Sequence, residues 1–363
     1  MVNKPSLIQG SHLRAKFIDR PNRFIVRCRL KNGEIVDTFM PNSGRLEELL
    51  EPEADMILEE STSGRDRKTK FTAVAVCRNK RWIGINAVAS NSIVTYLIEN
   101  KLIPQLEKIS VVKTEVSHGN SRFDFLVENE DGKRNFLEVK SVTLSSQGVA
   151  MFPDAITQRG QRHLLELARL SSREINPIVI FLVQGMDNDL FIPNYHTDFT
   201  FADIMKKVKD RITFIPVAVD WSMNLDLLNY VKVLEIPWDI MLSQIVDTGS
   251  YLLTLRVDSP SVTNVGSLGS LELKSGYYIY VGSGMNGLSS RIARHLRRRK
   301  KLKWHIDYIR EKADSVRAFP IHGTKSIEFE LASKVAKFYQ TCFPGFGSSD
   351  SPLSSHLFFS ETD

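Results

Sequence analysis

The chain has 363 residues, of which 42% are hydrophobic, so it is long enough for two or three domains with ordinary buried cores. It contains no apolar run of 18 residues, and residues 1–5 lack the charged-then-apolar pattern of a secretion signal. The three cysteines, Cys28, Cys77 and Cys342, are odd in number and far apart. These features argue against a membrane protein, a disulfide framework and a zinc cluster, and they predict a cytoplasmic location.

The charge is unevenly distributed along the chain. Residues 1–240 hold 32 Lys+Arg and 31 Asp+Glu, whereas residues 241–363 hold 16 and 11. Eight basic residues and no acidic residue lie within 291–303. Such a run forms either a solvated helix face or a phosphate-binding surface, and the lack of compensating acids favours phosphate. The expected phosphate contacts in this run are Arg294, Arg297 and Arg298.

The first part of the chain has the pattern of a small β-barrel. Short alternating segments bounded by turn residues predict strands at 24–30, 35–39, 71–77 and 81–86. One short helix is expected at 45–50. Several short strands with a single small helix predict an OB-like barrel over residues 1–86.

The hydrophobic period changes after residue 86. An amphipathic helix is expected at 90–102, followed by three strands, a long helix and two apolar strands separated by a helix. This order predicts a domain with a mixed sheet and covering helices over residues 87–240. The expected elements are strands at 109–116, 122–128, 135–142, 177–183 and 212–219, and helices at 154–170 and 201–209.

A third unit is expected over residues 247–363. Two strands, at 251–257 and 276–281, precede a basic helix at 288–300. Further elements are expected at 304–312, 316–321 and 328–339. The complete chain is therefore predicted to be a multidomain α/β (α+β) protein.

Asp124, Glu138 and Lys140 form the first set of residues that could carry chemistry. Asp124 lies on one predicted strand, and Glu138 and Lys140 share a face of the next. If these strands pair as a hairpin, the two carboxylates face each other, and a divalent cation would relieve their repulsion. Lys140 would then position water and stabilise the charge that builds on a scissile phosphate. The alternative is that all three are solvated residues on a polar strand face.

Neighbouring polar residues extend this prediction. Glu115, on the preceding strand, is either a further catalytic acid or a surface residue, and Arg122 shares a face with Asp124. Arg159 and His163 lie four residues apart on the next helix, where they could contact phosphate. For His163 we expect a plain helix-surface role.

A polar turn precedes the short helix expected in the barrel. Asn42, Ser43 and Arg45 either bind phosphate at the helix N-terminus or simply cap the helix. Arg67 and Lys68 belong to either a solvated loop or a strip that contacts a nucleic-acid backbone.

The chain resembles the sugar fermentation stimulation protein family, which carries a form of the PD-(D/E)XK nuclease core. The matching segments run in order over about residues 10–220. The resemblance implies an OB-like domain followed by a nuclease-like domain, with Asp124 and Glu138 as metal ligands and Lys140 as the catalytic lysine. It implies Mg²⁺ or Mn²⁺ as cofactor and an association with DNA. The segments are 40–46, 67–70, 119–125, 138–144 and 152–164.

The last third resembles a GIY-YIG-like subfamily of uncharacterised domains. The similarity rests on 249–251, 276–284, 291–296, 304–308 and 345–350. It implies catalytic roles for Tyr251, Tyr280 and Arg291 and a metal-binding role for Glu330, with Glu328 as its rival. Both tyrosines could instead be core residues, because aromatic strand residues mostly pack. The related domains often carry two cysteines where this chain has Ser351 and Leu353.

These observations predict a DNA-binding protein that is a divalent-metal-dependent endonuclease, with DNA preferred to RNA as its partner. The alternative is a non-catalytic nucleic-acid-binding or regulatory protein of sugar metabolism with degenerate nuclease sites. The sequence does not specify the oligomeric state, although a homodimer is common among enzymes that cut both strands.

Overall fold

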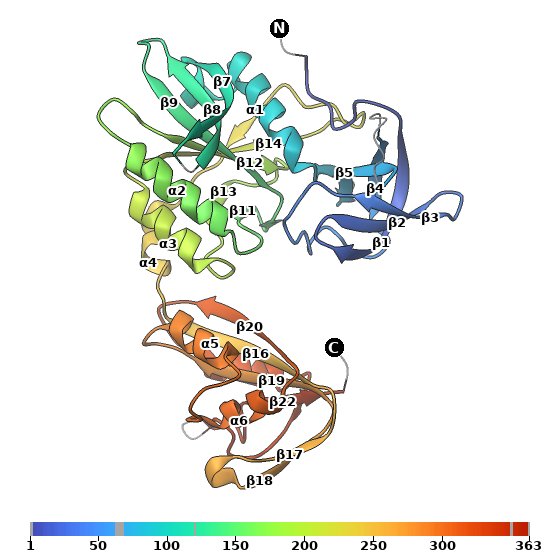
Figure 1. Cartoon of the computed structure of the whole chain (residues 1–363), viewed down its shortest axis with the longest axis vertical. Coiled ribbons are helices and arrows are strands. Elements are labelled where there is room, and N and C mark those ends of the chain that lie inside the picture. Colours follow the sequence, from blue (N-terminus) through green and yellow to red (C-terminus); the bar gives the residue numbers. More distant parts are fainter. Residues whose placement is uncertain (1–2, 62–68, 120, 349–350, 362–363) are drawn as a thin grey trace. The chain divides into compact units, whose positions relative to one another are not determined.

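The computed structural model describes residues 3–61, 69–119, 121–348 and 351–361. The chain forms two compact units, one of residues 1–194 and 200–238 and the other of residues 195–199 and 239–363 (Figure 1). Both the predicted barrel and the predicted mixed sheet belong to the first unit. The expected division into three domains at 86 and 240 stays a prediction, because a compact unit can hold more than one domain.

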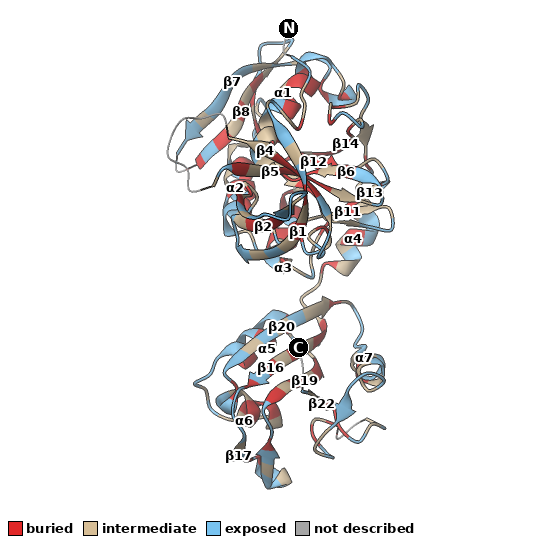
Figure 2. Ribbon diagram, turned by 90° about the vertical axis from the view of Figure 1, so that its right-hand side faces the viewer, coloured by how far each residue is buried: buried red, intermediate tan, exposed pale blue. Residues whose placement is uncertain are grey.

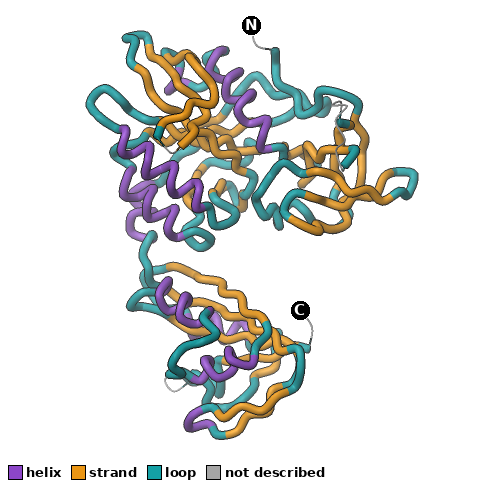
Figure 3. The backbone as a smooth tube through the Cα atoms, viewed as in Figure 1, coloured by secondary structure: helices purple, strands orange, loops and turns teal. Residues whose placement is uncertain are grey.

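Five strands close the N-terminal barrel in the order β1-β2-β3-β5-β4-β1. Closure depends on one parallel contact between β3 and β5, at Phe39 and Thr72. Strands and loops build this barrel (Figure 3). Its interior is filled by alternating apolar residues such as Val26, Cys28 and Ala73. The strands are β1 (His12–Asn22), β2 (Ile25–Leu30), β3 (Ile35–Phe39), β4 (Asp55–Glu60), β5 (Phe71–Arg78) and β6 (Arg81–Gly84).

The helix expected at 45–50 is absent from the structure. A hydrogen-bonded turn takes its place, in which the Leu49 and Leu50 amides donate to the Leu46 carbonyl at 3.0 and 2.9 Å. Leu46 has a φ of +55°, a left-handed conformation that stops helix propagation. The prediction of a helix N-terminus for phosphate at Asn42 and Ser43 is therefore wrong.

A six-stranded mixed sheet in the order β15-β14-β12-β9-β8-β7 forms the centre of the rest of the first unit. Helix α1 covers one face, and α2 and α3 cover the other. Strand β12 is buried along its whole length, because its alternate residues enter the two hydrophobic clusters on opposite faces of the sheet (Figure 2). The sheet comprises β7 (Ile109–His118), β8 (Ser121–Asn129), β9 (Arg134–Val142), β12 (Ile178–Gln184), β14 (Thr213–Val219) and β15 (Lys232–Val233).

The helices of this part begin and end close to the predicted positions, with one difference. Helix α2 was expected from residue 154 but begins at Gln158, where the Thr157 side chain accepts a hydrogen bond from the Gly160 amide and caps it. Residues 154–157 are thus freed to line a pocket. The remaining elements are η1 (Ala87–Ala89), α1 (Ser90–Glu99), η2 (Pro104–Leu106), α2 (Gln158–Leu170), α3 (Phe199–Val208), α4 (Trp238–Gln244) and a small sheet of β10 (Ser145–Ser146), β11 (Val149–Phe152) and β13 (Leu190–Pro193).

The second unit is built on an antiparallel sheet in the order β20-β16-β19-β22-β21. Its basic helix α5 ends at Leu296 rather than at residue 300, so residues 297–303 are not helical. Strand β22 was not expected from the sequence. The elements are β16 (Gly249–Val257), β17 (Ser261–Asn264), η3 (Gly266–Leu268), β18 (Ser270–Leu273), β19 (Gly276–Ser283), α5 (Leu288–Leu296), α6 (His305–Lys312), β20 (Ser315–His322), α7 (Glu328–Val335), β21 (Gln340–Thr341) and β22 (Leu357–Ser360).

Candidate functional site

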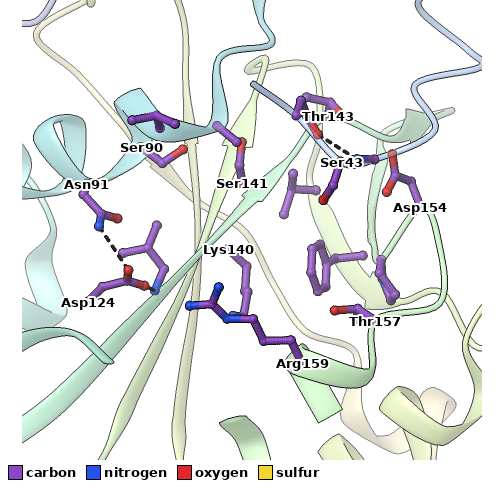
Figure 4. Close-up of a pocket in the computed structure, with 18 of the residues that line it drawn as sticks. Ser43, Ser90, Asn91, Asp124, Lys140, Ser141, Thr143, Asp154, Thr157 and Arg159 are labelled. Atoms are coloured by element: carbon purple, nitrogen blue, oxygen red, sulfur yellow. Dashed lines mark hydrogen bonds between the residues drawn. The ribbon is translucent and has the colours of Figure 1, made fainter. Parts of the chain in front are cut away.

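Asp124 sits where strands β8 and β9 part. The two strands pair from Glu128 and Arg134 to Phe125 and Leu137. One residue further on, the Asp124 side chain replaces the backbone ladder: its Oδ2 accepts a hydrogen bond from the Val139 amide at 2.8 Å. Its Oδ1 accepts another from the Asn91 side chain of α1 at 3.0 Å (Figure 4). These two bonds fix the carboxylate at the end of the hairpin.

The Glu138 side chain is buried, and one of its two carboxylate oxygens contacts two other side chains. Its Oε1 lies 2.5 Å from Lys140 Nζ and 2.6 Å from His163 Nδ1. Its Oε2 is buried and has no hydrogen-bond partner among the described residues. A buried carboxylate oxygen without a partner is costly unless a cation or a donor occupies that side.

The two carboxylates have opposite pKa shifts. Burial and the nearby charge of Glu138 raise the pKa of Asp124. Burial alone would raise the pKa of Glu138 too, but Lys140 and His163 hold it at about 2. A divalent cation between the two carboxylates would lower the cost of ionising Asp124 beside the charge of Glu138.

The donor set fits a divalent cation held by two carboxylates. Within the parts of the chain that the structure describes, no group of three or more His, Cys, Asp and Glu residues is arranged to hold a metal alone. A hard cation such as Mg²⁺ is commonly bound by one or two carboxylates and keeps several waters. Asp124 and the free Oε2 of Glu138 meet that requirement, with further positions left to water and substrate.

A pocket of about 1050 Å³ opens beside Asp124 and Lys140. Figure 4 shows Ser90 and Asn91 on one side of Lys140 and Thr157 and Asp154 on the other. Residues 42–44 of the barrel also line it, so the barrel, α1 and the segment before α2 all contribute walls. Asp154 links the segment before α2 to the barrel, because its Oδ2 accepts a hydrogen bond from the Leu46 amide at 3.2 Å.

The structure brings four of the other predicted residues to this pocket. Asn42, Ser43, Glu115 and Arg159 line it. Glu115 is exposed and forms an ion pair with Arg122, so neither side chain points to the Glu138 cluster as a fixed partner.

The other predicted nucleic-acid contacts of the barrel are Arg45, Arg67 and Lys68. The backbone carbonyl of Arg45 accepts a hydrogen bond from Arg20, and Arg45 does not line the pocket. Arg67 and Lys68 lie outside the described residues.

His163 is a buried residue of the site and not a helix-surface residue as expected. It is 2% exposed, faces Glu138 through Nδ1 and packs edge-on against Phe123. Its position one turn after Arg159, whose Nε is 3.4 Å from His163 Nε2, was visible in the sequence. Asn91 and Asp154 were missed because nothing in their local sequence links them to residues 33 and 108 positions away.

In the second unit, Tyr251 and His295 form a buried pair. Tyr251 is 1% exposed, and its hydroxyl lies 3.0 Å from His295 Nε2. Burial raises the pKa of both Tyr251 and Tyr280, and burial lowers the pKa of His295 to about 4. Arg291 donates to the Ser283 carbonyl. The predicted catalytic tyrosines and arginine therefore do gather on β16, β19 and α5.

The acid that faces these tyrosines is Glu328 rather than Glu330. Glu328 Oε1 lies 3.0 Å from His356 Nδ1, and the charge of Glu328 contributes to the raised pKa of Tyr280. Glu330 is exposed on the next part of α7. Glu328 is thus the acid nearer to the tyrosines, and the metal-binding role expected for Glu330 or its rival stays a prediction.

The basic run divides into internal and exposed residues. Arg294 donates two hydrogen bonds of 2.9 Å to the fully buried Asp307, and Lys300 Nζ lies 3.0 Å from the same carboxylate. The expectation that Arg294 is a free phosphate contact is therefore not supported. Arg297 and Arg298 are exposed beyond the end of α5.

Three family models match consecutive parts of the chain. Residues 18–85 match the SfsA N-terminal OB domain, residues 88–224 the sugar fermentation stimulation protein RE domain, and residues 250–363 a domain of unknown function, DUF123. The sugar fermentation stimulation protein homolog of Clostridium kluyveri is 38% identical over 212 residues, which cover 58% of this chain and 91% of the relative. The chain belongs to the sugar fermentation stimulation protein family.

Other family members agree with this result. The homolog of Methanothermobacter thermautotrophicus is 35% identical over 226 residues, covering 62% of this chain and 93% of its own length. The solved structure of Pyrococcus furiosus SfsA in complex with Ca²⁺ is 25% identical, with a TM-score of 0.58, and covers 64% of this chain and 99% of that one. The expected OB-like barrel and nuclease-like sheet with a separate C-terminal domain are confirmed.

Within the described residues, no helix is both long and apolar enough to cross a membrane.

Proposed function

We propose that this protein is a divalent-metal-dependent nuclease that hydrolyses phosphodiester bonds at the Asp124, Glu138 and Lys140 site, with DNA preferred to RNA. The free, buried Oε2 of Glu138 beside the raised-pKa carboxylate of Asp124 carries the proposal. A family member solved with Ca²⁺ supports a divalent cation, and Mg²⁺ or Mn²⁺ is proposed as the working ion.

The residues of the site would divide the work as follows. Asp124 and Glu138 would hold the cation, which supplies Lewis-acid charge and an activated water when bound. Lys140, already fixed against Glu138 at 2.5 Å, would stabilise the charge that develops on the scissile phosphate. His163 would orient Glu138 through its 2.6 Å contact and is thus a positioning residue.

The second unit is proposed to hold the substrate. Arg297 and Arg298 are exposed on a surface with uncompensated positive charge, which suits phosphate. Its cluster of Tyr251, Tyr280 and Arg291 with Glu328 is the second place where cleavage would occur if the first site were inactive.

Cleavage of labelled single-stranded, duplex, flap and branched DNA and RNA tests the proposal, with Mg²⁺ or Mn²⁺ and with EDTA. We expect Glu138→Ala and Lys140→Ala to reduce the rate at least about hundredfold while binding stays salt-sensitive. Glu130→Ala and Lys133→Ala, exposed residues of the same hairpin, are the matched controls and should cut normally.

The results separate three cases. Cutting that persists in Glu138→Ala but is lost in Glu328→Ala would move the chemistry to the second unit. Binding without cutting of any substrate would favour the non-catalytic, regulatory alternative. Metal-dependent cutting that disappears only with the first-site variants would establish the proposed nuclease.

A further inference from the structure

Two exposed aliphatic side chains border the pocket of the first site. Val88 is 75% exposed and Ile156 is 68% exposed, and both line the same pocket as Asp124 and Lys140. Single exposed apolar residues are ordinary on protein surfaces. Here two of them line one polar pocket, beside the residues proposed to cut a phosphodiester. Such a pair suits contact with an apolar part of the substrate.

The segments that carry these residues approach the site from different directions. Val88 belongs to η1, two residues before Ser90, and Ile156 directly precedes Thr157. Figure 4 shows Ser90 and Thr157 on opposite sides of Lys140. Val88 and Ile156 thus line the pocket from two different segments, η1 and the residues just before α2.

The charge of the pocket disfavours a duplex held by its backbone. Acidic and basic side chains are equal in number among the lining residues, so their formal charges cancel. Proteins that grip duplex DNA mainly through phosphates present clustered Lys and Arg instead. The charged lining residues are Glu115, Asp124, Asp154, Arg23, Lys140 and Arg159.

Hydroxyl groups also line the pocket, and that of Ser92 is already bonded to the Ala89 carbonyl. Ser90 is 3% exposed and lines the pocket, and its Oγ has no hydrogen-bond partner among the described residues. Ser43, Ser92 and Thr143 add hydroxyl groups to the same wall. Hydroxyls act as both donors and acceptors, so they suit the edges of bases as well as sugars and phosphates.

We propose that this pocket takes an unpaired strand of nucleic acid, with Val88 and Ile156 packed against bases that flank the scissile phosphate. The proposal rests on the proposed function and names its substrate class. Apolar side chains contact base faces favourably only where bases are not stacked on each other, as in the wedges of architectural proteins. Intact duplex would leave both side chains in water.

Oligonucleotides that carry 2-aminopurine test this proposal, because the fluorescence of that base reports its stacking. Binding of the full chain to a single strand, a fork and an intact duplex is measured with Ca²⁺ present. We expect Val88→Ser and Ile156→Ser each to weaken single-strand and fork binding roughly tenfold and to reduce the fluorescence change. Met223→Ser is the matched control, because Met223 is 76% exposed in the same unit and does not line the pocket.

Equal binding by all three variants and wild type would overturn the proposal, as would tighter binding of intact duplex without a fluorescence change. Unfolding midpoints of the variants check that each one folds. Wild-type protein that binds and unstacks the fork but never cuts it with Mg²⁺ or Mn²⁺ would defeat the proposed catalysis and leave the base contacts standing. Failure to bind any strand would overturn both.

Discussion

Glu138 has an asymmetric environment that decides how the first site can work. One oxygen receives both Lys140 and His163, and the other is buried without a partner. Lys140 and His163 hold the pKa of this residue at about 2, whereas burial and Glu138 raise the pKa of Asp124. Glu138 is thus always ready for a cation at neutral pH, and Asp124 is the carboxylate on which protons compete with the metal.

Metal binding should therefore stabilise the first unit through Asp124. With Mn²⁺ at about a hundred times its Kd, mass action adds about 2.7 kcal/mol to the free energy of unfolding. For a unit of this size that amounts to a rise in Tm of roughly 5–10 °C. We expect Asp124→Asn to abolish the rise, and thermal scans with and without Mn²⁺ measure it.

Glu115→Gln is the control for this measurement, since Glu115 lines the same pocket but is exposed and paired with Arg122. The Mn²⁺ shift should also shrink as the pH is lowered, beginning at a higher pH than an ordinary aspartate near 3.9 would give, because the pKa of Asp124 is raised. A shift that survives in Asp124→Asn, or that vanishes only in Glu115→Gln, would contradict the assignment of the ligands.

The sequence was sufficient to place Asp124, Glu138 and Lys140 near one another, because alternate residues of a strand share a face of the sheet. It was insufficient for His163, since the face that a helix buries depends on where the helix packs. It also could not show that Arg294 is engaged, because its partner Asp307 comes from the following helix. Charged residues are ambiguous until their long-range partners are known.

At the scale of elements, both sites lie where strands begin or part. The β8–β9 ladder ends at Phe125 and Leu137, just before Asp124. In the second unit, β16 begins at Gly249, which pairs with His322 of β20 and has a φ of +141°. A Cβ at Gly249 would lie 2.1 Å from the Ile321 carbonyl oxygen, so only glycine fits there.

Gly249→Ala should consequently destabilise the second unit strongly, by more than about 2 kcal/mol, because both the backbone conformation and the space are unsuitable. Gly323→Ala, at the residue that follows the His322 partner of Gly249, should have a small effect, since its Cβ would meet only the Lys325 carbonyl oxygen at 3.8 Å. Chemical denaturation of both variants measures the difference. Similar stability of the two would show that the strand start tolerates a side chain.

Elements with strong hydrophobic periods were predictable, whereas some turns and helix ends were not. Strand β12 is a continuous apolar run and was expected within one residue of its start and end. By contrast, residues 45–50 contain helix-forming residues but turn at Leu46, and residues 297–300 follow α5 without continuing it. In both places side chains take part in the hydrogen bonds that replace local helix bonds: the Leu46 amide donates to the distant Asp154 carboxylate, and Lys300 donates to the carbonyls of Arg294 and His295.

At the scale of the whole molecule, the chain joins a complete family fold to a second, basic unit. The Clostridium kluyveri relative is matched over 91% of its length by only 58% of this chain, so the second unit is an addition to the part that the relative shares. The excess positive charge also lies in the last third of the chain. This distribution supports the proposal that the first unit carries the chemistry and the second attracts the nucleic acid.

The salt dependence of binding tests that division of labour. If Arg297 and Arg298 each neutralise a phosphate of single-stranded DNA, the slope of log Kd against log salt should fall by about 1.4 in the double alanine variant. The double alanine variant should keep its metal-dependent cleavage rate at saturating substrate, because neither residue belongs to the first site. The control is Lys325→Ala with Lys337→Ala, two exposed lysines of the same unit outside the basic run, which should leave the slope unchanged. An equal loss of slope in both double variants would mean that net charge alone, and not the surface beyond α5, attracts the nucleic acid.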